Sequence, residues 1–264
     1  MDVWRAVGPS TGSVSATTTG VGSPVSLRAV SRDGAVPLWT FQMPHEVLGS
    51  PALEPDGDSP GLFLGSKFGD LIAIDAQTGR KRWHRMTGNW VDNNACVARV
   101  GDENVVFAGS YDRSVYALRA SDGSVLWRRR LGAEVFSAPC VFEVDGRQRV
   151  AVACLDNHLV ALDAATGEIR TCYYVGEPQW DRISKGDTLW GSPVALQVGK
   201  TAMLIHGSYD GAVYMVPARQ SALEVTPWRA ERLVWGMVIV LVLFAGVALP
   251  VLRRLDRGQG GRLP

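Results

Sequence analysis

A repeat of 44 residues is the feature that most restricts what this chain can fold into. Three sets of positions share the spacing: Trp39, Trp83 and Trp127; Ile74, Leu118 and Leu162; and Pro51, Ala95 and Pro139, which Pro193 follows after 54 residues. Three registers with one period indicate an architecture in which each repeat forms one supersecondary unit.

Each repeat contains four short segments with the alternation of a β-strand. In one copy these segments are residues 95–100, 104–110, 114–119 and those from 125 onward. Glycine in the turns Thr78-Gly79, Asp122-Gly123 and Thr166-Gly167 accepts the positive φ that a tight hairpin between the third and fourth strands requires. The tryptophan that follows is expected to dock between neighbouring units. Four short antiparallel strands in about 44 residues predict a β-propeller blade.

The repeat closely resembles the pyrroloquinoline-quinone-like (PQQ-like) repeat, whose pattern is G-S-x-D-G-x-V-Y-A-L-D-A-x-T-G-x-x-x-W. The copies in this chain read GSKFGDLIAIDAQTGRKRW at 65–83, ACLDNHLVALDAATGEIR at 153–170 and GSYDGAVYMV at 207–216. The resemblance implies the fold of a propeller. It specifies function poorly, because such repeats build quinoprotein alcohol dehydrogenases, an outer-membrane assembly lipoprotein and the C-terminal propeller of some acyl-activating enzymes.

We therefore expect an all-β fold, a propeller of about four PQQ-like blades at residues 37–217. The last blade lacks a fourth strand, and the segment 37–42 is expected to supply it. Three architectures remain open: a small closed ring, a half-ring that pairs with another copy or a different chain, and the C-terminal part of a longer propeller. Residues 1–36 form a flexible Ser/Thr/Gly-rich lead-in, but residues 25–29 resemble the third strand of a preceding blade, which favours the longer propeller.

The end of the sequence predicts a membrane anchor. Residues 233–252 carry no charge and match the roughly 20 residues that a helix needs to cross a bilayer. A juxtamembrane linker at 218–232 precedes this transmembrane helix, and a basic tail at 253–264 follows it. The tail holds one more arginine than the flank before the span, which favours a cytoplasmic tail and an extracytoplasmic propeller. The segment 1–26 has no apolar signal stretch, so a tail-anchored cytosolic orientation stays open.

Charge and motifs exclude several functions. Lys+Arg 27 against Asp+Glu 26 leaves a net charge of +1, which argues against a nucleic-acid partner. The sequence has no P-loop, H-E-x-x-H or paired C-x-x-C motif. The histidines occupy different registers of the repeat and predict no shared metal site; they are His45, His84, His158 and His206.

The resemblance raises an alternative, a truncated or split subunit of a PQQ-dependent quinoprotein dehydrogenase. It would imply PQQ with calcium, but no residue here matches the calcium ligands of those enzymes, and no two cysteines are adjacent. We therefore expect no cofactor and no catalysis. Cys140 and Cys154 are candidates to face each other across a hairpin, as a disulfide or as buried reduced thiols.

The extra ten residues before Pro193 mark the candidate binding surface. They fall in the loop 174–190, which joins an outermost strand to the next innermost strand. Such loops share one face of a propeller, and exposed aromatic residues beside mixed charges are common at interfaces. The residues predicted to form this partner or ligand face are His45, Glu46, Trp90, Asp92, Asn93, Asn94, Trp180, Asp181, Arg182, Lys185, Asp187 and Trp190. The sequence thus predicts a membrane-anchored binding scaffold that captures a protein partner or associates with itself to complete the propeller.

Overall fold

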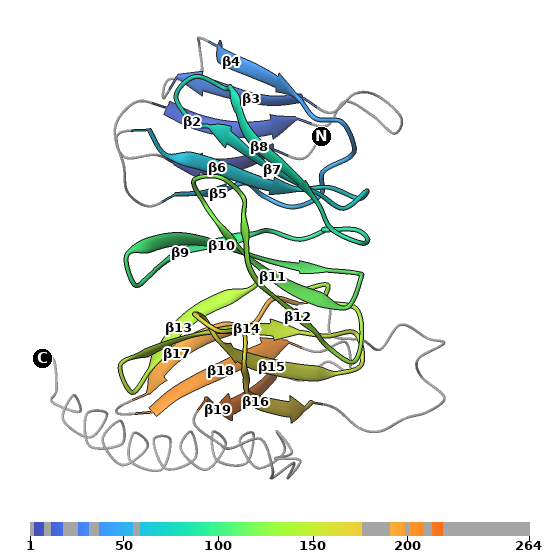
Figure 1. Ribbon diagram of the computed structural model, residues 1–264, viewed down its shortest axis with the longest axis vertical. Coiled ribbons are helices and arrows are strands. Elements are labelled where there is room, and N and C mark those ends of the chain that lie inside the picture. Colours follow the sequence, from blue (N-terminus) through green and yellow to red (C-terminus); the bar gives the residue numbers. More distant parts are fainter. Residues whose placement is uncertain are drawn as a thin grey trace, which may run out of the picture. The chain divides into compact units, whose positions relative to one another are not determined.

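All residues that the computed structural model describes lie in β-strands or in the turns and loops that join them (Figure 1). The described ranges are 3–7, 12–17, 26–31, 37–54, 59–175, 191–198, 201–207 and 213–218, and they belong to the first of two compact units, residues 1–225. These ranges contain no α-helix, in agreement with the all-β fold that the repeat predicts.

The predicted membrane segment lies outside the described residues. This holds for the span 233–252, for the tail 253–264 and for the linker 218–232 beyond Ala218. Within the part of the chain that is described, no helix is long and apolar enough to cross a bilayer. Membrane insertion therefore stays a prediction of the sequence.

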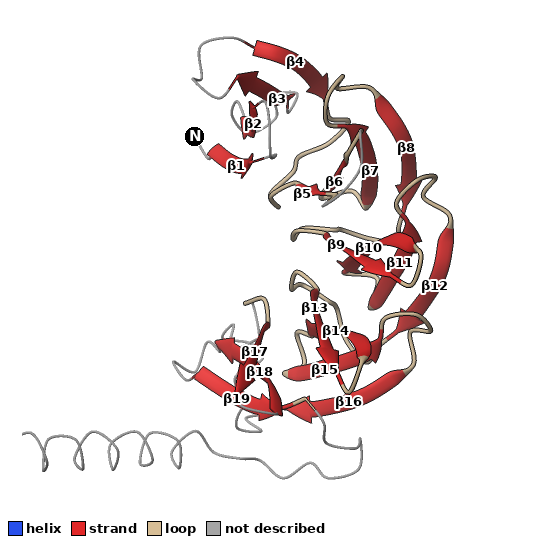
Figure 2. Cartoon of the chain, turned by 90° about the vertical axis from the view of Figure 1, so that its left-hand side faces the viewer, coloured by secondary structure: helices blue, strands red, loops and turns tan. Residues whose placement is uncertain are grey.

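The strands form five antiparallel sheets in chain order (Figure 2). The first sheet contains β1 (Val3–Val7), β2 (Gly12–Thr17), β3 (Ser26–Ser31) and β4 (Pro37–Gln42). The second contains β5 (Ala52–Leu53), β6 (Gly61–Gly65), β7 (Asp70–Asp75) and β8 (Lys81–Met86). The third contains β9 (Cys96–Val100), β10 (Glu103–Ser110), β11 (Ser114–Arg119) and β12 (Val125–Arg130). The fourth contains β13 (Cys140–Val144), β14 (Arg147–Ala153), β15 (His158–Asp163) and β16 (Ile169–Tyr174), and the fifth β17 (Val194–Val198), β18 (Thr201–Gly207) and β19 (Val213–Pro217).

Each sheet is a meander in which every strand pairs with its neighbour in sequence. The pairing of the third and fourth strands shifts register once in each of the four-stranded sheets, always after an alanine. These alanines are 44 residues apart; they are Ala29, Ala73, Ala117 and Ala161. The repeated unit is therefore the four-stranded blade that the sequence predicts, in a propeller-like arrangement.

The prediction that the segment 37–42 completes the last blade is wrong. This segment is β4, and it pairs with β3 of its own sheet, whereas the sheet β17–β18–β19 has three strands. The described residues thus form four sheets of four strands and one of three, instead of about four blades. Pairing of β4 with β3 closes only a short loop. Pairing of β4 with β19 would close a loop that contains most of the chain, which costs more entropy. Residues 3–31, expected to be a lead-in with a remnant of a blade, contain β1, β2 and β3.

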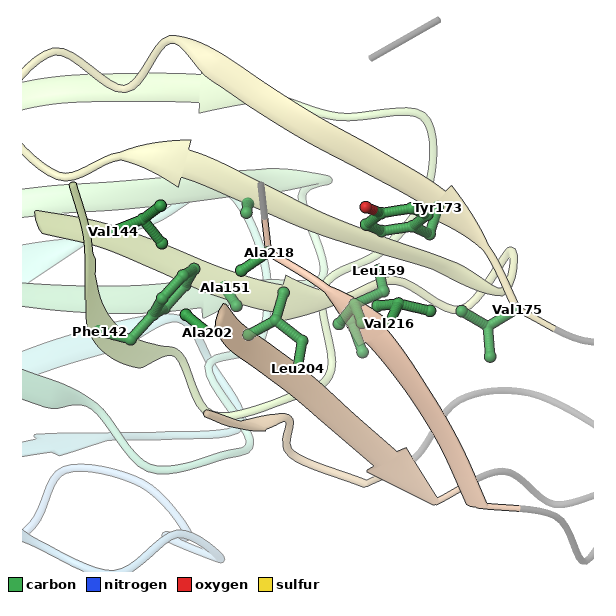
Figure 3. Packing of buried hydrophobic residues seen from close by; sticks show 12 residues of the cluster. Phe142, Val144, Ala151, Leu159, Tyr173, Val175, Ala202, Leu204, Val216 and Ala218 are labelled. Atoms are coloured by element: carbon green, nitrogen blue, oxygen red, sulfur yellow. The ribbon is translucent and has the colours of Figure 1, made fainter. Parts of the chain in front are cut away.

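Apolar side chains fill the space between each pair of consecutive sheets. Alternate residues of a strand point to opposite faces, so Leu62 and Leu64 of β6 pack towards the first sheet and Phe63 packs towards the third. Four clusters arise in this way, one at each junction. Figure 3 shows the cluster between the fourth and fifth sheets, where Leu204 of β18 lies among side chains from both.

The repeated tryptophans connect successive sheets, as predicted. Each indole Nε1 donates a hydrogen bond to an alanine carbonyl of the next sheet: Trp39 to Ala76 (2.9 Å), Trp83 to Ala120 (2.8 Å) and Trp127 to Ala164 (2.9 Å). Each ring also lies against the turn glycine of that next sheet, which has φ near +70°; these glycines are Gly79, Gly123 and Gly167. The turn glycines therefore serve both the hairpin and the contact between sheets.

The fourth junction uses different residues for the same contact. Thr171 stands 44 residues after Trp127, and its Oγ1 lies 3.5 Å from the carbonyl oxygen of Ala218. The Tyr173 hydroxyl donates to the carbonyl of Pro217, and the buried Tyr173 ring supplies the apolar area. A smaller hydrogen-bonding group and a neighbouring aromatic ring together replace the indole.

We expect Gly123→Ala to destabilise the fold more than Gly101→Ala. Both glycines have positive φ, +70° and +59°, so each alanine costs about 1–2 kcal/mol of backbone strain. A Cβ at Gly123 would lie 2.6 Å from the Trp83 ring, whereas nothing lies within 4 Å of a Cβ at Gly101. Overpacking should add about 1–3 kcal/mol at Gly123 alone. Urea unfolding of the purified protein in detergent measures both, and equal losses would contradict the docking role of the turn.

Candidate protein-binding face

The loops between sheets lie against the turns of the following sheet. Backbone hydrogen bonds of 2.9 Å repeat at three junctions: Lys67 N to Glu46 O, Tyr111 N to Trp90 O, and Leu155 N to Glu134 O. The donors lie in the turns between the second and third strands, and the acceptors lie in the loops that precede each sheet. The loops and the turns at Phe68 and Tyr111 therefore lie together at one end of the sheets and form a single face. We call this surface the loop face.

The loop 176–190 lies outside the described residues. Six of the predicted partner-face residues belong to it: Trp180, Asp181, Arg182, Lys185, Asp187 and Trp190. The six others are described. His45 belongs to an aspartate network and Trp90 to an exposed aromatic group, while Glu46 and Asp92 are acidic residues near them and Asn93 and Asn94 have structural contacts.

Asp70, at the start of β7, holds two histidines on the loop face. Its side chain is 1% exposed; Oδ2 lies 2.7 Å from Nδ1 of His45, and Oδ1 lies 2.8 Å from Nε2 of His84. The Ser66 hydroxyl donates a further hydrogen bond to Oδ2. Burial by itself raises the pKa of Asp70, but the hydrogen bonds from Ser66, His45 and His84 outweigh it and hold the pKa below its usual value. Asp70 is therefore a carboxylate that orders the loop before β5.

Phe68 occupies a position that holds aspartate in the next two sheets, at Asp112 and Asp156. Asp112 accepts hydrogen bonds from the Gly88 amide (3.0 Å) and from Arg128 (2.9 Å). Phe68 makes no such bonds: its ring stacks on His45 with centroids 4.2 Å apart and stays 62% exposed. The second sheet thus exposes an aromatic ring where the third sheet has an internally bonded carboxylate.

A second aromatic group lies on the neighbouring junctions. Trp90 is 44% exposed and lies 5.5 Å from Tyr111, which lies 5.7 Å from Phe136 in an edge-on contact. Burial, with smaller contributions from Asp92 and Glu134, raises the pKa of Tyr111 to about 12, so its phenol stays protonated and able to donate. The rings come from three separate segments and form a second aromatic group, distinct from the stacked pair of Phe68 and His45.

Charged and polar residues accompany these rings. The Lys67 ammonium pairs with Glu46 at 3.1 Å. Burial is the largest effect on the pKa of Asp92 and raises it. The positive charge of Lys67 lowers this pKa and the negative charge of Glu46 raises it, and the net result is a pKa above the usual value. One carboxylate oxygen of Asp92 is buried without a hydrogen-bond partner. Asp92 is therefore a largely buried carboxyl group whose ionised form is disfavoured by burial.

Asn93 and Asn94 have contacts within the fold instead of a free amide. Asn93 Nδ2 donates to the carbonyl of Phe136 at 2.7 Å, and Asn94 Oδ1 accepts from the amide of Ser50. These bonds join adjacent loops across the junction. Sequence reasoning missed the contributions of Phe68, Phe136 and Asp70. The sequence did contain one indication of the role of Phe68: it stands at a position where the repeat pattern has aspartate.

The histidines on Asp70 and the four cysteines are candidates for a metal centre or a disulfide. The two histidines on Asp70 each direct a ring nitrogen at its carboxylate, and in the described ranges no three His, Cys, Asp or Glu side chains are arranged to hold a metal ion. The four cysteines are free thiols. Cys140 pairs across its hairpin with Ala151, so Cys154 is not its opposite residue.

Sheets of this kind, joined by tryptophan contacts and repeated along the chain, define a propeller-like repeat protein. A family model described as outer membrane protein assembly factor BamB matches residues 69–225, more than half of the chain. The chain therefore belongs to this family, which confirms the resemblance to the PQQ-like repeat. None of the curated proteins matches the sequence.

Solved structures agree on the fold. BamB from Moraxella catarrhalis matches with a TM-score of 0.59 at 20% identity, over 82% of this chain and 57% of that one. BBS1N, solved in complex with ARL6DN, matches with a TM-score of 0.55 at 14% identity, over 82% of this chain and 64% of that one. The present chain thus spans less than two thirds of either structure. At these identities the likeness shows the fold alone.

We expect Asp70→Asn to lower the free energy of unfolding by about 1–3 kcal/mol at pH 7, because hydrogen bonds in the network are lost. The pKa of Asp70 is lowered by folding, so its contribution is present above about pH 4 and is lost as the pH falls further. The variant should therefore lose less stability than the wild type between about pH 5 and pH 3.

Urea titrations at several pH values measure this difference. Asp102→Asn is the matched control, because Asp102 is an exposed turn residue. An acid profile of Asp70→Asn that parallels the wild-type profile would contradict the network.

Proposed function

We propose that this protein is a non-catalytic, membrane-anchored scaffold that binds a protein partner on its loop face. The observation that carries the proposal is the exposure of Phe68 and Trp90 on loops that the fold holds in place. Large aromatic side chains presented on a rigid support are typical anchors of protein interfaces, since little entropy is lost when a partner covers them.

The chemistry of the loop face favours a partner surface that is apolar at its centre and polar at its rim. Phe68 and Trp90 supply the apolar area, while the ion pair of Glu46 and Lys67 and the carboxylate of Asp92 lie around them. Mixed charges of this kind add specificity and orientation more than affinity. A protein segment with an aliphatic or aromatic anchor and polar groups that complement Glu46 and Lys67 fits this arrangement.

The comparisons support a binding role in general terms. The matching family is described as an assembly factor, and BBS1N was solved in complex with another protein. We propose that this chain, too, acts through protein contacts. The proposal includes no cofactor, because no residue of the sequence matches the calcium ligands of the quinoprotein dehydrogenases.

Photo-crosslinking tests the loop face in the full-length protein in cells. A photoreactive amino acid in place of Phe68 or Trp90 should yield a common crosslinked protein band. The same group in place of Val125 should not, although Val125 is 54% exposed on β12. Alanine at the aromatic position that is not carrying the probe should weaken binding by about 2 kcal/mol and reduce the band. Equal crosslinking at all three positions, or none at Phe68 and Trp90, would contradict the proposal.

Membrane anchoring is tested separately by extraction. The full chain should stay with membranes in alkaline carbonate and dissolve only in detergent, because the uncharged segment 233–252 is long enough to span the hydrocarbon core. Replacing Val240 and Leu243 with lysine should release the protein, since charges at the centre of a span are costly. Release of the wild-type chain by carbonate would contradict the anchor, and protease digestion of sealed vesicles would report which side the propeller occupies.

A further inference from the structure

One face of the fifth sheet packs on the fourth sheet, and no other sheet of the described residues packs on its opposite face. Strand pairing assigns the faces, because residues directly opposite each other on antiparallel strands point the same way. Ala195, Leu204 and Val216 are mutually paired and lie in the cluster with the fourth sheet. Figure 3 shows Leu204 and Val216 from this sheet beside Leu159.

The opposite face is apolar. Pairing places Val194 opposite Ile205, Leu196 opposite Met203, and Ile205 opposite Met215. Val213 lies on the same face, opposite Gly207. Val194, Leu196, Val198 and Val213 are 48–62% exposed. We call this surface the end face; it carries no charged residue.

The repeat shows that a sheet covers the same face in every preceding unit. Val213 corresponds to a residue that is 0% exposed in each of the four earlier sheets, whereas Val213 itself is 62% exposed; the four residues are Leu27, Leu71, Val115 and Leu159. The same correspondence holds for other residues of the end face. Each lies 54 residues after a buried residue of the cluster between the fourth and fifth sheets; the pairs are Leu196 and Phe142, Val198 and Val144, Ile205 and Ala151, and Met215 and Ala161. The end face therefore has the composition of an interior junction, and a β-sheet is the kind of surface that such a face receives.

The first sheet is a poor candidate to cover it. Leu27 and Ala29 of β3 point into the junction with the second sheet. The other face of β3 and β4 presents Arg28 opposite Thr40, both exposed. Covering Val213 with this surface would bury a guanidinium among apolar side chains with no carboxylate on the end face to pair with it, which is costly. This argument applies to the first sheet of the same chain and of another copy alike.

We infer that the end face is a self-association surface, on which the fifth sheets of two copies of this chain pack face to face about a two-fold axis. A contact about a two-fold axis requires a surface patch that complements itself. An uncharged face of valine, leucine, isoleucine and methionine complements itself without any pairing of charges. A face of three short strands is smaller than the roughly 800 Å² per partner of a standard interface. The dimer is therefore reversible and depends on concentration.

Sedimentation equilibrium of the full-length protein in detergent tests the inference. The wild type should show a monomer–dimer equilibrium. Val213→Lys should raise the dissociation constant at least about tenfold, because the dimer would bury two ammonium groups in an interface that has no carboxylate to pair with them. Val125→Lys is the matched control: Val125 is also an exposed strand valine, 54% against 62%, but it lies on β12, away from the end face. A wild type that stays monomeric at about 100 μM, or equal constants for the two variants, would overturn the inference.

A labelling experiment separates a second copy from coverage by the same chain. Val213→Cys should react quickly with a maleimide at low protein concentration and slowly at high concentration, as followed by mass spectrometry of its peptide. Protection that does not change with concentration would mean that the chain itself covers the end face, and it would overturn the inference. Unchanged circular dichroism of the variants confirms folding, which an exposed valine position permits. Crosslinking at Phe68 should persist in Val213→Lys, since the loop face and the end face are separate surfaces.

Discussion

The contact of a tryptophan with the turn of the next sheet is the interaction on which the rest of this structure depends. The indole buries a large apolar area against a glycine, which has no side chain to block the contact, and its Nε1 donates a hydrogen bond to an alanine carbonyl of the next sheet. Because the contact recurs every 44 residues, the first three junctions share the same hydrogen bond and the same contact of ring and glycine. The clusters of buried side chains and the loop-to-turn hydrogen bonds follow from that spacing.

The loop face is a consequence of this regular stacking, altered at one unit. In the third sheet, Asp112 ties its turn to the preceding loop. In the second sheet the carboxylate lies two residues later, at Asp70, where it holds His45 and His84. Phe68 stands at the position that corresponds to Asp112, and its ring stacks on His45 and is exposed on its other side. The same repeat can therefore keep its internal hydrogen bonding and still present an aromatic anchor.

Sequence reasoning succeeded where local chemistry repeats and failed where pairing is decided over distance. Strands, turns and tryptophan contacts of the repeat were predictable because each has a residue-level signal, such as the glycines of positive φ. The segment 37–42 was assigned to the wrong sheet because a strand's pattern does not name its partner. The strands in residues 3–31 escaped notice because serine, threonine and glycine dominate this stretch and obscure the alternation. Asn93 and Asn94 looked like surface groups because their acceptors and donors lie far away in sequence.

The sequence by itself determined the repeat, its period, the four-stranded unit and the residues that join one unit to the next. These depend on periodicity and on the conformational freedom of single residues, which local sequence expresses directly. Only the tertiary structure decided which strands share a sheet, that Asp70 joins two histidines, and that Val213 is exposed although Leu71, Val115 and Leu159 are buried. An alternating pattern tells which side chains share a face, but whether a face is covered depends on what lies next to it in space.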